Sequence, residues 1–103
     1  MAVKAVHGAG NGQQAVDIFA ASMPDEFDAI LMDVMMPVMD GLEATRRIRA
    51  MDRLDAKTIP IIAMTANAYR EDERKSAEAG MNAHLTKPID PNKVLQVLRD
   101  FLE

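Results

Sequence analysis

Asp-Val-Met-Met-Pro-Val-Met-Asp-Gly, residues 33–41, is the stretch of sequence that decides the fold. It follows the apolar run Ala-Ile-Leu-Met at residues 29–32, which is typical of a buried β-strand. Asp33 therefore stands where that strand ends, and Pro37 and Gly41 turn the chain towards a helix. Open α/β sheets place their functional groups at the carboxyl ends of parallel strands, so Asp33 is the first candidate for a functional residue.

Strand and helix patterns alternate along the rest of the chain. Strand patterns cover residues 3–7, 27–33, 59–64 and 81–86. Helix patterns cover residues 12–23, 40–51, 68–79 and 91–102. Asn11 and Asp40 fit N-caps of the first two helices, and Gly80 fits a C-cap after the third. The polar residues 52–57 predict a loop. Strands separated by helices indicate βαβ units, so we predict one α/β domain over residues 1–103, with a parallel sheet and helices on both faces.

The composition excludes several functional classes. The net charge of -4 offers no basic surface for nucleic acid or anionic lipid, and no apolar run approaches the length of a membrane span. The cysteine count of 0 and the lack of a signal-type N-terminus predict a cytoplasmic location. The two histidines lack an acid cluster that would complete a transition-metal site. The glycines of residues 8–12 have the wrong spacing for a dinucleotide-binding loop.

Three side chains of complementary chemistry stand at the ends of predicted strands. Asp33, Thr65 and Lys87 end the second, third and fourth strands. Because the carboxyl ends of parallel strands share one edge of a sheet, we expect these side chains to converge. A carboxylate can attack phosphorus and become an acyl phosphate, while the ammonium neutralises the phosphoryl oxygens and the hydroxyl donates a hydrogen bond to one.

The same motifs resemble the receiver domain of bacterial two-component response regulators, which has a flavodoxin-like (CheY-like) fold. The resemblance is carried by residues 33–41, by Met-Thr-Ala at 64–66 and by Lys-Pro at 87–88, in that order within residues 3–102. Residues 80–90 look most like receivers attached to hybrid sensor histidine kinases. The resemblance predicts a domain that switches an output or a partner when it is phosphorylated.

The resemblance also implies a role for each matching residue. Asp33 would be phosphorylated by a histidine kinase or a phosphotransfer protein, Thr65 would contact the phosphate, and Lys87 would pair with it. Asp33 and the main-chain carbonyl of Met35 would contribute to a Mg²⁺ shell. The peptide bond before Pro88 would be cis.

His84 stands three residues before Lys87, where receivers often carry a Tyr or Phe that moves on activation. A histidine there could make switching pH-sensitive, and the alternative is a partly exposed surface residue.

The chain departs from the receiver pattern at its N-terminus. It begins at what resembles the second, edge strand of a receiver, and no acid occurs before Asp17, so the acid pair that binds Mg²⁺ is missing from these residues. Asp33 and one carbonyl are too few ligands for Mg²⁺, which predicts poor autophosphorylation from small donors.

The sheet could compensate in two ways: the strand at 3–7 moves beside the strand at 27–33, or two chains exchange elements. In either case an apolar face beside the last helix would be left exposed, so we expect a homo-oligomer.

Two other functions compete with the phosphoacceptor. One is a phosphorylation-incompetent receiver fragment that acts as a protein-interaction or self-association module. The other is a flavodoxin-like binder or enzyme for a nucleotide or flavin, although no phosphate loop or stacking aromatic residue supports it.

Overall fold

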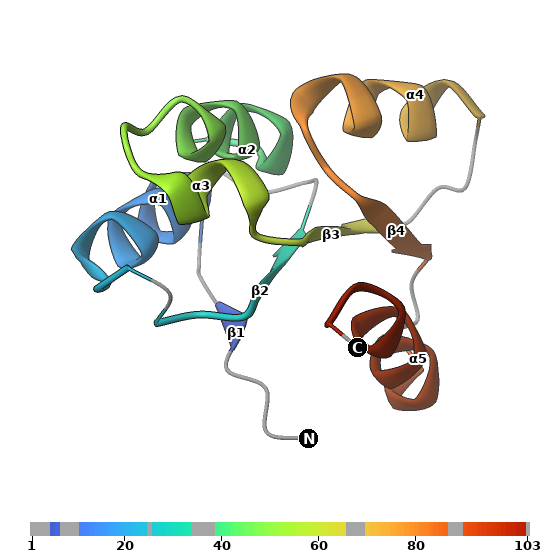
Figure 1. The fold of residues 1–103 in the computed structure, drawn as a ribbon. Coiled ribbons are helices and arrows are strands. Elements are labelled where there is room, and N and C mark those ends of the chain that lie inside the picture. The colour runs from blue at the N-terminus through green and yellow to red at the C-terminus, as the bar shows by residue number, and fades with distance from the viewer. Residues whose placement is uncertain are drawn as a thin grey trace.

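The computed structural model describes residues 5–6, 11–24, 26–33, 39–65, 70–86 and 90–102. In Figure 1 each labelled strand is followed along the chain by a helix, and α3 follows α2 before the next strand. The elements are β1 (Ala5–Val6), α1 (Gly12–Ala21), β2 (Ala29–Asp33), α2 (Gly41–Arg49), α3 (Leu54–Thr58), β3 (Ile61–Thr65), α4 (Arg70–Ala79), β4 (Ala83–Thr86) and α5 (Pro91–Leu102).

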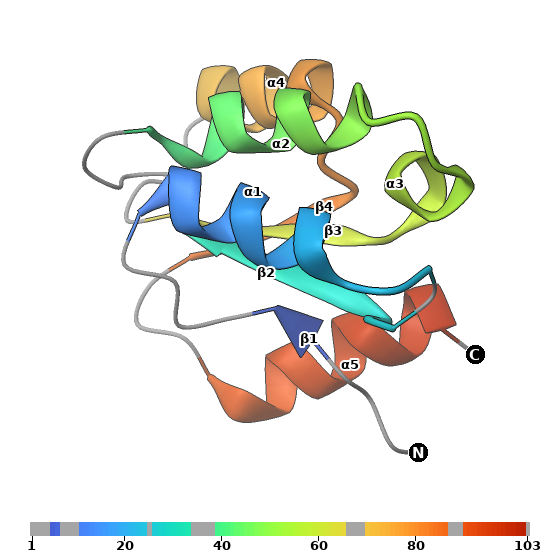
Figure 2. The same ribbon diagram turned by 90° about the vertical axis from the view of Figure 1, so that its left-hand side faces the viewer.

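The four strands form one parallel sheet in the order β1-β2-β3-β4. Ala5 lies opposite Ala29, so β1 takes the place beside β2, as the first of the two predicted arrangements requires. Each connection moves the chain to the next strand towards the same edge of the sheet. Right-handed crossovers that all move towards one edge place their helices on one face of the sheet. Accordingly α1, α2, α3 and α4 cover one face and α5 lies on the other (Figures 1 and 2).

The main core lies between the sheet and the helices α1, α2 and α3. Its largest fully buried side chains include Phe19 of α1, Ile48 of α2, and Ile30 and Met32 of β2. Ile30 and Met32 are two positions apart and therefore share one face of the sheet. Ala20, the residue after Phe19 in α1, is exposed.

The predicted ends of three helices are confirmed. The Asn11 side chain accepts a hydrogen bond from the N–H of Gln14 at 2.9 Å and caps α1. The Asp40 side chain accepts from the N–H of Glu43 at 2.9 Å and caps α2. Gly80 ends α4 with a φ of 109°, a left-handed conformation that favours glycine.

The prediction of a loop at residues 52–57 is wrong, because Leu54–Thr58 forms α3. Ala56 is fully buried in the core, and the carboxylate of Asp55 is buried in a pair of hydrogen bonds with the guanidinium of Arg53, at 2.6 and 2.7 Å. Arg53 also donates to the carbonyl of Phe19 at 3.0 Å and lies over its ring. The polar side chains that suggested a loop instead pair with each other, and Arg53 also binds a carbonyl in the last turn of α1.

The helix α5 packs on the sheet through part of its apolar stripe. Leu98 is buried, whereas Leu95 is 51% exposed and Phe101 is 42% exposed. The apolar stripe of α5 thus continues beyond the area that one sheet face covers. Among the described residues, no helix has the length and apolar character needed to cross a membrane.

Candidate functional site at the carboxyl edge of the sheet

The structure places two of the three predicted site residues at the carboxyl ends of adjacent strands. Asp33 is the last residue of β2 and lies opposite Met64. Thr65, the next residue after Met64, ends β3. Asp33 is half-buried and Thr65 is buried. A partly exposed acidic residue therefore stands beside the strand that ends in a buried threonine.

Of the other predicted site residues, the structure describes only His84. Lys87, Pro88 and Met35 lie outside the described residues, although β4 ends at Thr86, directly before Lys87. His84 lies within β4, half-buried and opposite Ala63. Ala63 belongs to the core between the sheet and the helices α1, α2 and α3, so His84 lies on that face of the sheet. The next residue, Leu85, lies on the opposite face, which α5 covers.

The start of α2 packs directly on the end of β2. A Cβ atom at Gly41 would meet the carbonyl oxygen of Asp33, and it would lie 2.9 Å from Cγ of Met32. Only a glycine allows this approach without a shift of the backbone. The packing places the start of α2 against the main chain of Asp33.

The start of α1 contacts the same region. The N–H of Gly12 donates to the carbonyl of Met39 at 2.8 Å, and Met39 directly precedes the α2 cap, Asp40. Sequence reasoning missed this contact, because it considered the glycines of residues 8–12 only as a possible dinucleotide-binding loop. No local pattern could have revealed it, since the two partners are far apart in the sequence.

Arg49, at the end of α2, fixes the turn that leads into β4. Its guanidinium donates to the carbonyl of Gly80 at 2.8 and 3.0 Å, to Oδ1 of Asn82 at 2.8 Å and to the carbonyl of Ala56 at 3.1 Å. Burial lowers the pKa of Arg49 by desolvation, but a guanidinium remains protonated under ordinary conditions. Asn82 in turn receives the N–H of Ile61 at 2.9 Å, so β3 and β4 are held in register at their starts.

The residues present do not fit a complete magnesium site. The described part of the chain holds no group of three or more His, Cys, Asp or Glu side chains that could bind a metal. Within residues 34–38, next to Asp33, the sequence has no acid that could be added. Because Mg²⁺ needs several oxygen ligands in near-octahedral geometry, Asp33 would be a single protein carboxylate among them.

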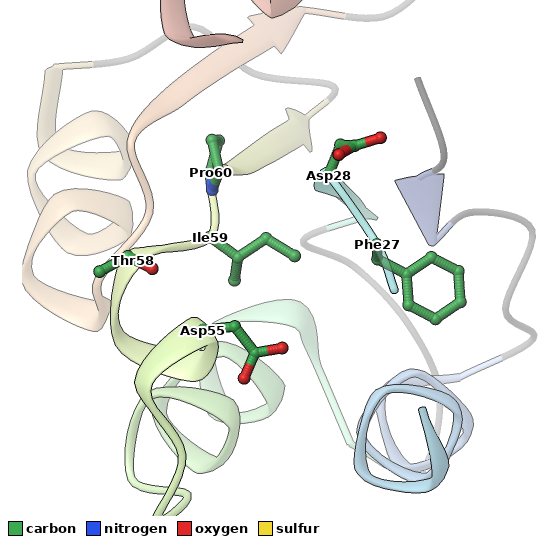
Figure 3. A pocket seen from close by; sticks show the side chains of 6 residues that line it. All are labelled: Phe27, Asp28, Asp55, Thr58, Ile59 and Pro60. Carbon is green, nitrogen blue, oxygen red and sulfur yellow. The ribbon is translucent and has the colours of Figure 1, made fainter. Parts of the chain in front are cut away.

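A small cavity lies at the opposite edge of the sheet, where β2 and β3 begin. It has a volume of about 190 Å³ and is lined by Phe27, Asp28, Asp55, Thr58, Ile59 and Pro60 (Figure 3). Asp55 is already paired with Arg53, so one of the two acids at this cavity is neutralised. Because the cavity lies where β2 and β3 begin, it is separate from the edge where Asp33 and Thr65 end these strands.

The response regulator receiver domain family matches residues 1–99. The chain belongs to this family, and it is a receiver domain of the kind found in two-component signal transduction. The expected receiver fold and the resemblance to receivers of hybrid histidine kinases are both confirmed.

Relatives and solved structures agree on this family. The chain is 40% identical over 101 residues to "Probable histidine kinase 2" of Oryza sativa subsp. indica, a match that covers 87% of this chain and 10% of the relative. It is 41% identical over 92 residues to "Hybrid signal transduction histidine kinase I" of Dictyostelium discoideum, with 87% of this chain and 5% of the relative covered. The chain therefore spans a tenth or less of these curated relatives.

Among solved structures, a receiver domain of a Pseudomonas aeruginosa sensor histidine kinase is similar with a TM-score of 0.77 and 40% identity, covering 90% of this chain and 72% of that one. That structure has a magnesium ion coordinated in its active-site cleft. A Vibrio cholerae chemotaxis response regulator is similar with a TM-score of 0.81 and 30% identity, covering 91% and 74%.

Proposed function

We propose that Asp33 accepts a phosphoryl group from the phosphohistidine of a histidine kinase or a phosphotransfer protein. A carboxylate oxygen of Asp33 forms the new bond to phosphorus, the P–N bond breaks, and the imidazole of the donor leaves with its electron pair. The product is an acyl phosphate. The position of Asp33, at the carboxyl end of β2 beside the strand that ends in Thr65, is the observation that supports this role.

Thr65 and Lys87 are the residues proposed to recognise the phosphoryl group. The hydroxyl of Thr65 donates a hydrogen bond to one phosphoryl oxygen, and the ammonium of Lys87 neutralises the added charge of roughly −1.5 to −2. The modified protein then shifts its population towards a second conformation, which a partner recognises through α4, β4 and α5. The domain acts as a switch in the cytoplasm and does not turn over a diffusible substrate.

The metal dependence of this chain should be weak. Mg²⁺ supplies charge neutralisation when it is bound at a receiver site. Asp33 and the carbonyl of Met35 are the groups of this chain that we assign to it, and they leave most of the shell to water. We therefore expect slow autophosphorylation from acetyl phosphate, and a fast stoichiometric adduct would contradict this.

The phosphoacceptor is tested by mass spectrometry after incubation with a phosphorylated phosphotransfer protein. The unmodified chain should gain the mass of one phosphoryl group, and Asp33→Asn should gain none. Asp28→Asn is a matched control, because Asp28 is an exposed acid just before the other end of β2. Equal labelling of Asp33→Asn and the unmodified chain would disprove the assignment.

Self-association through α5 is a second candidate function, which requires no phosphorylation. Leu95 and Phe101 are exposed on α5, while Arg99 and Asp100 offer both charges beside them. Two antiparallel copies of α5 could cover the apolar side chains and pair Arg99 of one copy with Asp100 of the other, as a two-fold interface requires. A second copy of this chain is the favoured partner for α5, because Arg99 and Asp100 are complementary to each other.

Sedimentation at micromolar concentration distinguishes this candidate. The unmodified chain should sediment as a dimer, and both Leu95→Glu and Phe101→Glu should give monomers. Ile18→Glu is the control, since Ile18 is 41% exposed on α1, on the other face of the sheet. A monomeric unmodified chain would refute self-association. A dimer that takes up no phosphate would favour it over the phosphoacceptor.

A further inference from the structure

The hydrogen bond between Gly12 and Met39 joins two elements that meet at the candidate site. The first N–H groups of a helix have no acceptor within the helix, so Gly12 at the start of α1 needs an outside partner. It donates to the carbonyl of Met39 at 2.8 Å. Met39 is the first described residue after the segment 34–38, which follows Asp33 directly.

The close approach leaves no space for a side chain at position 12. A Cβ atom there would overlap the carbonyl oxygen and carbon of Met39, and it would lie 3.0 Å from the carbonyl oxygen of Asp40. These are backbone atoms, which cannot rotate away as the end of a flexible side chain can. The only described glycine with a positive φ is Gly80, so the demand at Gly12 is for space rather than for an unusual conformation.

Asp33 and Met39, which flank residues 34–38, are both held by contacts with other elements. At one end, Asp33 is held by its pairing with Met64 and by the packing of Gly41 on its carbonyl. At the other end, Met39 is held by Gly12, and Asp40 caps α2. A displacement at Met39 acts on its neighbour Asp40, which caps α2, and Gly41 at the start of α2 packs on the carbonyl of Asp33.

We propose that Gly12 is a positioning residue for the Asp33 site, which it serves by anchoring the carbonyl of Met39. This inference rests on the proposed phosphoacceptor role of Asp33. In reactions that depend on orientation, a misplacement of about 1 Å can cost about a hundredfold in rate. Gly12→Ala should therefore slow phosphoryl transfer to Asp33 by about tenfold or more, although position 12 touches no reacting atom.

The first measurement needs no substitution. Amide hydrogen exchange, followed residue by residue by NMR, should find the N–H of Gly12 protected in the unmodified chain. A helix start without an outside acceptor would leave this N–H exposed to exchange. Rapid exchange at Gly12 would overturn the anchor, whatever happens at Asp33.

The second measurement compares variants in exchange and in transfer from a phosphorylated phosphotransfer protein. Gly12→Ala should speed amide exchange at Asp40 and Gly41 and slow the transfer. Gln13→Ala, in the same turn, should change neither. Asn11→Ala removes the cap of α1 without filling the space beside Met39, so it shows what a weakened α1 does alone.

The outcomes separate this inference from the proposed function. Transfer to Gly12→Ala at the unmodified rate, or the same slowing in Asn11→Ala at equal stability, would overturn the positioning role and leave the phosphoacceptor intact. No transfer to the unmodified chain would overturn both. Should Gly12→Ala fail to fold, protection of the Gly12 N–H together with normal transfer in Asn11→Ala still supports the anchor, and rapid exchange still refutes it.

Discussion

Replacing Arg49 by methionine removes the guanidinium that joins α2, α3 and the turn before β4, and it leaves an unbranched side chain of similar length. The lost contacts are four hydrogen bonds, two to the carbonyl of Gly80 and one each to Asn82 and Ala56. Gly80 and Asn82 are at least partly exposed, so water can replace the guanidinium there. The carbonyl of Ala56 is less easily satisfied, because the residue four positions later is Pro60, which has no N–H.

The magnitude follows from this difference between the acceptors. A hydrogen bond to a charged group contributes about 1.5–3 kcal/mol, and a buried acceptor left without a partner costs about 1–3 kcal/mol. With the exposed acceptors rehydrated, Arg49→Met should lower the free energy of unfolding by about 2–3 kcal/mol. For a domain of this size, the melting temperature should fall by about 10–20 °C.

Urea unfolding followed by circular dichroism measures this loss. Arg47→Met is the matched control on the same helix, because Arg47 is 55% exposed and pairs only weakly with Glu43 at 3.3 Å; it should stay within about 0.5 kcal/mol of the unmodified chain. Although burial lowers the pKa of Arg49, the guanidinium stays protonated under ordinary conditions, so the loss on substitution should be constant between about pH 6 and 9. An Arg49→Met variant as stable as Arg47→Met would refute the reasoning.

Three further substitutions test separate parts of the fold. Gly41→Ala should lower the free energy of unfolding in urea by about 1–3 kcal/mol, since the new Cβ would meet the carbonyl of Asp33; an increase in stability would contradict this packing. Arg53→Ala should cost about 3 kcal/mol by leaving the carboxylate of Asp55 buried and unpaired, and Asp55→Asn added to it should recover part of that loss. Leu98→Ala should cost about 2–5 kcal/mol by calorimetry, and a change below about 1 kcal/mol would mean that α5 does not pack on the sheet as described.

Local patterns in the sequence predicted the parts of the fold that local forces determine. Asn11 and Asp40 were identified as caps because a side chain and an N–H three residues later suffice to form one. The position of β1 beside β2 was one of two arrangements that the sequence left open, and the structure has that one. The strand-end positions of Asp33 and Thr65 were also predicted, although their roles remain a prediction.

Contacts between distant residues could not be predicted in the same way. The segment that forms α3 looked like a loop because Arg53 and Asp55 are charged, and nothing local shows that they bury each other against Phe19. The bond between Gly12 and Met39 depends on how α1 and α2 meet above the sheet, which no periodic pattern encodes.

The sheet order has a consequence for how the chain folds. Each of the four described strands pairs with the strand next to it in the sequence, so each pairing closes a loop that contains a single crossover. The entropy lost in closing such loops is small, and no strand must be inserted between two others that have already paired. The sheet can therefore grow by adding one strand at a time. We expect its refolding after dilution from urea to be fast for a parallel sheet, without a slow step of strand insertion.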